Sequence, residues 1–221
     1  MKKNFLLFAL VFILSSAAFA ASESDNLKLA YYKVKFSIFE SMPRDTEKIV
    51  FLGDSLTDYV KFEEIFPDLK IKNRGIAGDT TLGVLKRLDE VISLKPSKLF
   101  LLIGTNDIVF NRKAAEIVSS IRKIIETFRE KSPSTALYVQ TLFPVNHNLG
   151  DARRPHEAIR EINDGLLNLS NEIKDFTLID TYSLFAENGQ LPERYTIDGV
   201  HLNGTGILRW MEFLSVWIKE N

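Results

Sequence analysis

The sequence contains no cysteine, and this absence excludes three kinds of chemistry. Disulfide bonds, thiolate metal sites and a cysteine nucleophile all need a thiol. Histidine is scarce as well, with three among the 221 residues. We therefore expect the fold to depend on its packed core alone, and any histidine-dependent reaction to have few candidate residues.

An excess of charge of one sign is also missing. The chain has 28 Lys and Arg against 29 Asp and Glu, and 45% of its residues are hydrophobic. This weakly acidic balance argues against a nucleic-acid partner, which would favour a basic patch. The length suits one well-buried domain, and no linker, repeat or low-complexity tract divides it.

The only feature suggestive of a membrane lies at the N-terminus. An apolar run, Phe5–Leu14, follows Lys2 and Lys3 and precedes small residues that end at Ala20. This pattern predicts a secretory signal peptide at residues 1–20. An uncleaved anchor is the weaker alternative, because the run is shorter than the roughly 20 residues that cross a bilayer.

Cleavage after Ala20 would remove two lysines and no acidic residue, so the formal charge would change from −1 to −3. We therefore expect an exported bacterial protein, periplasmic or secreted, without stable membrane insertion. The oligomeric state is not indicated by the sequence.

From residue 48 onward, short apolar runs alternate with segments of helical periodicity. Near-continuous apolar strands are typical of a parallel sheet buried on both faces, and the alternation gives right-handed βαβ units. We expect a three-layer α/β/α, flavodoxin-like fold with a central five-stranded parallel sheet. Its predicted strands are residues 48–52, 69–73, 98–103, 136–142 and 176–179, and its helices carry apolar stripes at 82–92, 117–128, 159–169 and 205–219.

The sequence before the first strand predicts one further helix, over residues 24–42. It would belong to an N-terminal helical extension (21–46) that precedes the main domain (47–221). Four apolar residues are spaced to share one helical face: Leu27, Tyr31, Val34 and Ile38. Alternation at 33–36 leaves a strand as the alternative.

Polar segments follow the predicted strands at the points where the strands end. They are residues 53–55, 73–80 and 104–107, and a fourth segment, 198–201, lies just before the last helix. Ligands of open α/β sheets bind beyond the carboxyl ends of the strands. We therefore expect the four segments to meet at one edge of the sheet.

Ser55 and His201 have the residue types of a nucleophile and its base. A serine hydroxyl becomes nucleophilic when a neighbouring base takes its proton, and histidine is the usual base. Asp198 lies three residues before His201 in a glycine-containing turn. At that spacing its carboxylate can bind one ring nitrogen and leave the other facing Ser55, as in a catalytic triad.

Acyl transfer also needs donors for the oxyanion of the tetrahedral intermediate. Gly78 can present an uncrowded backbone N–H, and Asn106 can add a side-chain amide. The backbone N–H of Ser55 would be a third donor. These residue types together predict acyl-transfer chemistry.

The four segments, in this order, resemble the sequence blocks of the SGNH, or GDSL, hydrolases. The matching stretches are Gly-Asp-Ser-Leu at 53–56, Gly-Ile-Ala-Gly-Asp at 75–79, Gly-Thr-Asn-Asp at 104–107 and Asp-Gly-Val-His at 198–201. One block alone is a weak pattern, but four in order are specific. The chain is most similar to the bacterial branch related to platelet-activating-factor acetylhydrolase subunits.

The resemblance implies a serine esterase that needs no cofactor and no metal. It implies a triad of Ser55, Asp198 and His201, and an oxyanion hole made by Ser55, Gly78 and Asn106. The expected substrate is a short-chain acyl ester, with acetyl as the expected group, of a carbohydrate or small molecule. A lysophospholipase or thioesterase for longer acyl chains is the alternative, and a non-catalytic binding module on the same fold is a third.

Simpler roles exist for the residues at the strand ends. Ser55 could cap the following helix, and Asn106 could stabilise a turn. The three aspartates beside them are expected to brace loops: Asp54, Asp79 and Asp107. Asp198 and His201 could instead be metal ligands, but no cysteine or second well-placed histidine accompanies them.

The polar segment after the fourth predicted strand contains the other two histidines, His147 and His156. We expect both to be solvated surface residues. Arg153 and Arg154 in the same segment could line the cleft and hold an anionic group of the substrate. We assign neither arginine a role from the sequence.

Overall fold

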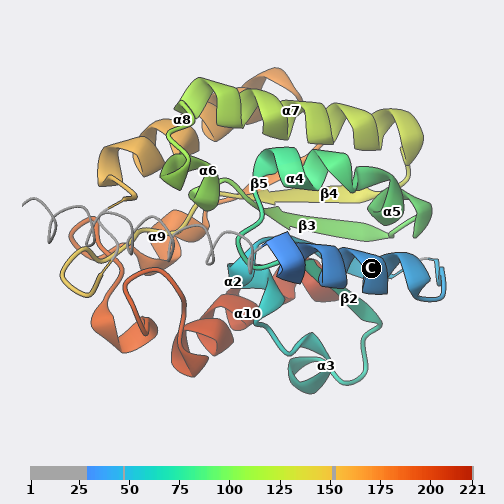
Figure 1. The fold of residues 1–221 in the computed structure, drawn as a ribbon, viewed down its shortest axis with the longest axis horizontal. Coiled ribbons are helices and arrows are strands. Elements are labelled where there is room, and N and C mark those ends of the chain that lie inside the picture. Colours follow the sequence, from blue (N-terminus) through green and yellow to red (C-terminus); the bar gives the residue numbers. More distant parts are fainter. Residues whose placement is uncertain (1–28, 47, 151–152, 221) are drawn as a thin grey trace, which may run out of the picture.

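The computed structural model describes residues 29–46, 48–150 and 153–220. The predicted signal peptide therefore lies outside the described residues. Five parallel strands form one sheet in the order β2-β1-β3-β4-β5 (Figure 1). They are β1 (Ile49–Gly53), β2 (Ile71–Gly75), β3 (Lys98–Leu102), β4 (Ala136–Gln140) and β5 (Thr177–Ile179). This order confirms the flavodoxin-like fold that the alternating pattern predicts.

Helices cover both faces of the sheet and complete the three layers (Figure 1). One face carries α4 (Thr81–Lys86), α5 (Leu88–Ser93), α7 (Ala114–Lys131) and α8 (His156–Glu172), and the opposite face carries α10 (Gly204–Lys219). The short elements are α2 (Ser55–Asp58), α3 (Phe62–Ile65), α6 (Thr105–Val109), α9 (Thr181–Phe185) and the 3-10 turn Glu193–Tyr195. Within the described ranges, no helix is both long and apolar enough to cross a membrane.

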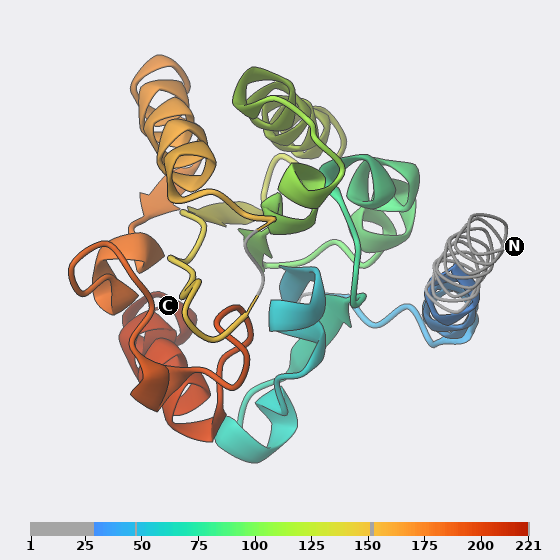
Figure 2. The same ribbon diagram turned by 60° about the vertical axis from the view of Figure 1, so that its left-hand side comes forward.

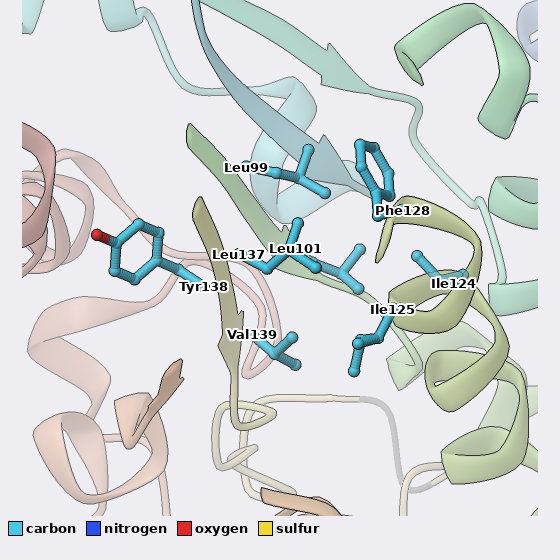
Figure 3. A pocket seen from close by; sticks show the side chains of 8 residues that line it. All are labelled: Leu99, Leu101, Ile124, Ile125, Phe128, Leu137, Tyr138 and Val139. Carbon is cyan, nitrogen blue, oxygen red and sulfur yellow. The ribbon is translucent and has the colours of Figure 1, made fainter. Parts of the chain in front are cut away.

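Side chains of the central strands alternate between the two faces, so the strands are apolar on both sides. Leu101 and Val139 point toward α7, where they meet Ile125 (Figure 3). Tyr138 points the other way and stacks on Phe100, with ring centroids 4.7 Å apart. The sheet is therefore the middle layer of a continuous core.

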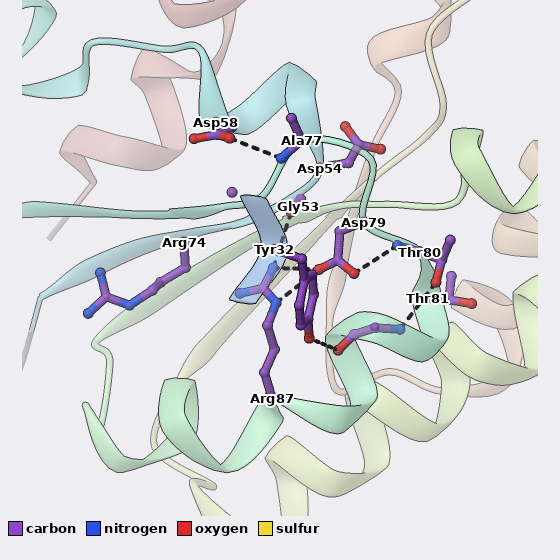
Figure 4. A network of polar contacts seen from close by, with 12 residues as sticks. Tyr32, Gly53, Asp54, Asp58, Arg74, Ala77, Asp79, Thr80, Thr81 and Arg87 are labelled. Carbon is purple, nitrogen blue, oxygen red and sulfur yellow. Dashed lines mark hydrogen bonds and ion pairs between the residues drawn. The ribbon is translucent and has the colours of Figure 1, made fainter. Parts of the chain in front are cut away.

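A single helix is predicted over 82–92, but the structure has two helices there, because the helical backbone is interrupted at Arg87. The backbone of Arg87 leaves the helical region at φ −114° and ψ 12°. Its buried guanidinium donates to Asp79 Oδ2 at 2.9 Å and to the carbonyl of Gly53 at 3.2 Å (Figure 4). The single apolar face expected here is also wrong, because Leu82 is 47% exposed.

Strand β4 ends at Gln140, two residues before the predicted boundary. Beyond it, the backbone N–H of Leu142 donates to Asn163 Oδ1 on α8 at 2.7 Å, outside the sheet. A side chain on the neighbouring helix thus replaces the strand partner. A long loop, which we call the β4–α8 loop, begins here and contains the described residues 141–150 and 153–155.

Residues 29–41 form the expected N-terminal helix, so the strand alternative at 33–36 is wrong. The predicted packing face is wrong as well: Tyr31, Val34 and Ile38 are exposed by 40% or more. A different side of the helix packs instead, and Phe39 lies with its ring 4.5 Å from the Arg74 guanidinium at the end of the edge strand β2. This helix has two apolar faces, and the periodicity alone does not distinguish them.

Candidate active site

The four polar segments meet at the carboxyl edge of the sheet, as the topology requires. A cleft of about 480 Å³ opens there. Its lining includes Ser55 from the start of α2, Gly78 after β2, Asn106 from α6 and His201 from the turn before α10. The structure thus brings together four of the five predicted site residues, and the fifth, Asp198, lies behind His201.

Three side chains form a continuous chain of hydrogen-bond contacts into the cleft. Ser55 Oγ lies 2.9 Å from His201 Nε2. On the other side of the ring, His201 Nδ1 lies 2.6 Å from Asp198 Oδ2. This geometry has the order of nucleophile, base and orienting acid.

The second carboxylate oxygen of Asp198 stabilises the turn in which this residue lies. Asp198 Oδ1 accepts from the backbone N–H groups of His201 at 2.8 Å and of Val200 at 3.0 Å. Partial burial alone would raise the pKa of Asp198, but the bonds from the His201 ring and these N–H groups keep the pKa below its ordinary value. Asp198 therefore remains a carboxylate able to stabilise a charged imidazole.

Asp54, and not Ser55, is the N-cap of α2. Asp54 Oδ1 accepts from the backbone N–H of Leu56 at 3.0 Å, and Ser55 is the first residue inside the helix. The capping role considered for Ser55 is therefore wrong, and its hydroxyl is turned toward His201 instead. The cap leaves the serine side chain available for other contacts.

Gly78 has the backbone freedom that its position requires. Its φ is +82°, which is unfavourable for residues with a side chain, and no atom lies within 4 Å of the place where a Cβ would stand. The preceding N–H, of Ala77, donates to Asp58 Oδ2 at 2.9 Å (Figure 4). Asp58 thus fixes the loop that presents Gly78 to the cleft.

Asn106 is held by two partners of opposite kind. Its Nδ2 donates to the backbone carbonyl of Asp79 at 2.9 Å, and its Oδ1 accepts from Arg154 Nη2 at 2.9 Å. An amide nitrogen carries two N–H groups, so one remains for a ligand in the cleft. The contacts of Asn106 therefore extend well beyond a local turn.

The other aspartates make the bracing contacts expected of them. Asp79 forms a buried ion pair with Arg87. Asp107 accepts from the backbone N–H of Thr81 at 2.9 Å and from its hydroxyl at 2.6 Å, so α6 is tied to α4.

The structure corrects one expectation for this region and supports another. His147 in the β4–α8 loop and His156 at the start of α8 are half-buried, with ring centroids 4.1 Å apart and ring planes tilted by 34°, so they are not simply solvated. Arg153 and Arg154 both line the cleft, and Arg154 is 7% exposed. The sequence offered one signal that this loop contributes to the site, namely that it also follows a strand at the carboxyl edge.

Aromatic residues that sequence reasoning did not select also line the cleft. They are Tyr31 from the N-terminal helix, Tyr59 after α2 and Phe110 after α6. All three are at least 40% exposed. In the part of the chain that the structure describes, no group of three or more His, Asp or Glu side chains could hold a metal ion.

Comparison with known proteins identifies the family of this chain. The sequence profile of the GDSL-like Lipase/Acylhydrolase family matches residues 51–207. Platelet-activating factor acetylhydrolase IB subunit alpha2 of Homo sapiens is 28% identical over 166 residues, or 72% of this chain and 70% of that protein. These relatives support an ester hydrolase.

Solved structures show the same fold. A Streptococcus pneumonia protein, described as a platelet activating factor, is similar with a TM-score of 0.84 and 27% identity, over 91% of this chain and 99% of that chain. An acetylxylan esterase of Geobacillus stearothermophilus has a TM-score of 0.63 at 19% identity, over 80% of this chain and 96% of that chain. With more than half of its length matched, this chain belongs to the GDSL-like lipase/acylhydrolase family and is an ester hydrolase.

Proposed function

We propose that this protein is an exported serine esterase that removes short acyl groups, with acetyl as the expected group, from a carbohydrate or small-molecule ester. The observation that carries the proposal is the contact chain from Asp198 through His201 to Ser55, which ends in an open cleft. The signal-peptide pattern at 1–20 supports export, and a mature N-terminus at Ala21 is the expected product of cleavage.

In the acylation step, Ser55 Oγ attacks the ester carbonyl carbon while its proton passes to His201 Nε2. The carbonyl oxygen becomes an oxyanion, which the backbone N–H groups of Ser55 and Gly78 and the remaining amide N–H of Asn106 would bind. Asp198 stabilises the charged imidazole and stays ionised. The bond to the alcohol then breaks, and His201 returns the proton to the leaving oxygen.

In the deacylation step, a water molecule replaces the alcohol. His201 takes the proton of the attacking water, and the water oxygen bonds to the acyl carbon on Ser55. The second tetrahedral intermediate collapses, the proton returns to Ser55 Oγ, and the free acid leaves. The same three donors serve both intermediates.

Two observations support a small ester as the substrate. The cleft volume of about 480 Å³ lies within the roughly 300–1,000 Å³ typical of small-molecule sites. Among the similar proteins, both the acetylhydrolase subunit and the acetylxylan esterase are named for acetyl esters. The aromatic lining offers flat apolar surfaces against which the alcohol part of the ester can pack.

An acyl-chain series of p-nitrophenyl esters, from two to sixteen carbons, tests this proposal. We expect kcat/KM to peak at two to four carbons and to fall by about tenfold or more by eight carbons, as a short acyl site loses complementarity. Lysophosphatidylcholine and an acetylated xylooligosaccharide are the natural-type comparison. A maximum at eight carbons or longer, with turnover of the lysophospholipid, would favour the long-chain alternative.

A further inference from the structure

Arg154 is buried in the wall of the cleft, where arginine is seldom found unless it is paired. Its Nη2 donates to Asn106 Oδ1 at 2.9 Å. Its Nε donates to the backbone carbonyl of Thr105 at 3.2 Å and lies 3.1 Å from the Thr105 hydroxyl. One guanidinium thus contacts two consecutive residues at the start of α6, including the asparagine assigned to the oxyanion.

The chemistry of these partners determines which way the Asn106 amide faces. A guanidinium has donors and no acceptor, so Arg154 can bind only the amide oxygen. The carbonyl of Asp79 has no proton to donate, so it can bind only the amide nitrogen. A flipped amide would lose both bonds, so the observed orientation is favoured. In this orientation the second N–H of Asn106 has a defined direction.

The β4–α8 loop that supplies Arg154 is itself attached to the rest of the site. His147 Nε2 lies 2.9 Å from the backbone carbonyl of Arg154. Earlier in the loop, the N–H of Asn146 donates to the carbonyl of Gly199 at 2.8 Å, within the turn between Asp198 and His201. The loop therefore contacts both the turn that holds the base and the asparagine of the oxyanion site.

The contact at Gly199 permits no side chain. A Cβ there would lie 2.2 Å from the backbone oxygen of Asn146, and the φ of Gly199 is +86°. The backbone of the loop and the turn are therefore in close approach. Through Asn146 and the adjacent His147, the segment that carries Arg154 is linked to the turn that carries His201.

We propose that Arg154 is a positioning residue, which holds the Asn106 amide so that one N–H faces the developing oxyanion. Its charge also polarises the amide and makes that N–H a stronger donor, an effect that is strengthened because the Arg154 and Asn106 side chains are both buried. This inference rests on the proposed role of Asn106 in the oxyanion hole. The benefit appears in the transition state, because the ester carbonyl gains its charge there.

A double-mutant cycle on the full chain tests the proposal, with p-nitrophenyl acetate as the substrate. We expect Asn106→Ala to lower kcat on the order of a hundredfold, the usual loss of one oxyanion donor. Arg154→Met should lower kcat by about tenfold or more and change KM by less than about threefold. In the Asn106→Ala background, Arg154→Met should then lower kcat by less than about threefold, because the residue through which it acts is gone.

Two further variants separate position from charge. Arg154→Lys keeps the charge but not the planar fork, so it should recover only part of the lost kcat. Arg160→Met is the matched control: it removes an exposed arginine from α8, near the same loop and outside the cleft lining, and should leave kcat unchanged. Circular dichroism and thermal unfolding establish that each variant folds. If Arg154→Met does not fold, Arg154→Lys takes its place in the double-mutant cycle.

The outcomes distinguish this inference from the function on which it rests. Equal losses for Arg154→Met in both backgrounds would overturn the positioning role and leave the esterase proposal intact. A loss confined to KM, and to the anionic ester 4-acetoxybenzoate, would instead make Arg154 a direct ligand of the substrate. Unchanged kcat in Asn106→Ala alone would remove the oxyanion role of Asn106 and the inference with it.

Discussion

At the scale of single residues, Asp54 is a carboxyl with no solvent exposure directly beside the proposed nucleophile. Its Oδ1 caps α2, whereas its Oδ2 has no hydrogen-bond partner among the described residues. Burial raises the pKa of Asp54 to about 7; the bond from Leu56 and the charge of Arg154 oppose the rise, and the nearby Asp79 carboxylate adds to it. Ionised Asp54 is therefore disfavoured in the folded chain.

This shift predicts how stability changes with pH. Unfolded, Asp54 loses its proton near its ordinary pKa of 3.8, while the folded protein keeps it until about pH 7. Between these values the unfolded state binds fewer protons, so the Asp54 contribution to the free energy of unfolding decreases as pH rises. Asp54→Asn keeps the helix cap and removes this contribution.

Urea unfolding at pH 4.5 and pH 7.5 measures the effect. We expect the stability of Asp54→Asn relative to the wild type to increase by roughly 2–4 kcal/mol between these pH values. If the difference between the two proteins is the same at both pH values, Asp54 is not the buried neutral acid described above.

The sequence indicates which residues could act, but not all of their partners. Ser55, Asn106 and His201 belong to short segments at strand ends, whose meeting point follows from the parallel topology. Arg154 reaches the same place through the β4–α8 loop, which has no periodicity and whose path depends on tertiary contacts. Nothing in the local sequence distinguishes Arg154 from its neighbour Arg153.

At the scale of elements, three segments meet at the carboxylate of Asp58. Its Oδ2 accepts from the Tyr31 hydroxyl at 2.6 Å and from the N–H of Ala77 at 2.9 Å, and its Oδ1 pairs with Lys35 at 2.6 Å. The N-terminal helix, α2 and the loop before Gly78 are therefore linked at one point. Because Tyr31 also lines the cleft, this helix shapes the site in addition to covering the sheet edge.

We predict that Asp58→Asn lowers kcat/KM for p-nitrophenyl acetate by about three- to tenfold, since the loop that presents Gly78 loses a charged acceptor. Tyr31→Phe keeps the ring in the cleft and removes one donor, so its effect should be smaller. Asp89→Asn is the matched control, because Asp89 makes an exposed pair with Lys131 far from the cleft lining. Equal activity of Asp58→Asn and Asp89→Asn would show that Asp58 does not support the site.

Helix and strand positions were largely predictable, whereas their orientation was not. The N-terminal helix occurs where its periodicity indicates, yet Phe39 is its buried anchor and Val34 faces solvent. The apolar stripe at 82–92 predicts one helix, but in the structure the Arg87 side chain points inward to Asp79 and the helix is interrupted. In both cases a contact made only in the folded chain decides between alternatives that are locally equivalent.

At the scale of the whole molecule, the topology explains why the site lies where it does. All five strands are parallel, so every strand ends at the same edge, and the cleft lies at that edge. A second view of the molecule shows the N-terminal helix at its side, away from α7 and α8 (Figure 2). The fold was predictable because near-continuous apolar strands alternate with amphipathic helices along the whole domain.

The central claim is that Ser55 is the nucleophile of this ester hydrolase, and covalent labelling tests it most directly. A serine-directed fluorophosphonate, followed by tryptic digestion and mass spectrometry, should place one phosphonyl group on the peptide of residues 49–61, which contains Ser55. Ser55→Ala should take up no label and lose at least about a thousandfold in kcat with p-nitrophenyl acetate. A label on another residue, or wild-type hydrolysis by Ser55→Ala, would contradict the account.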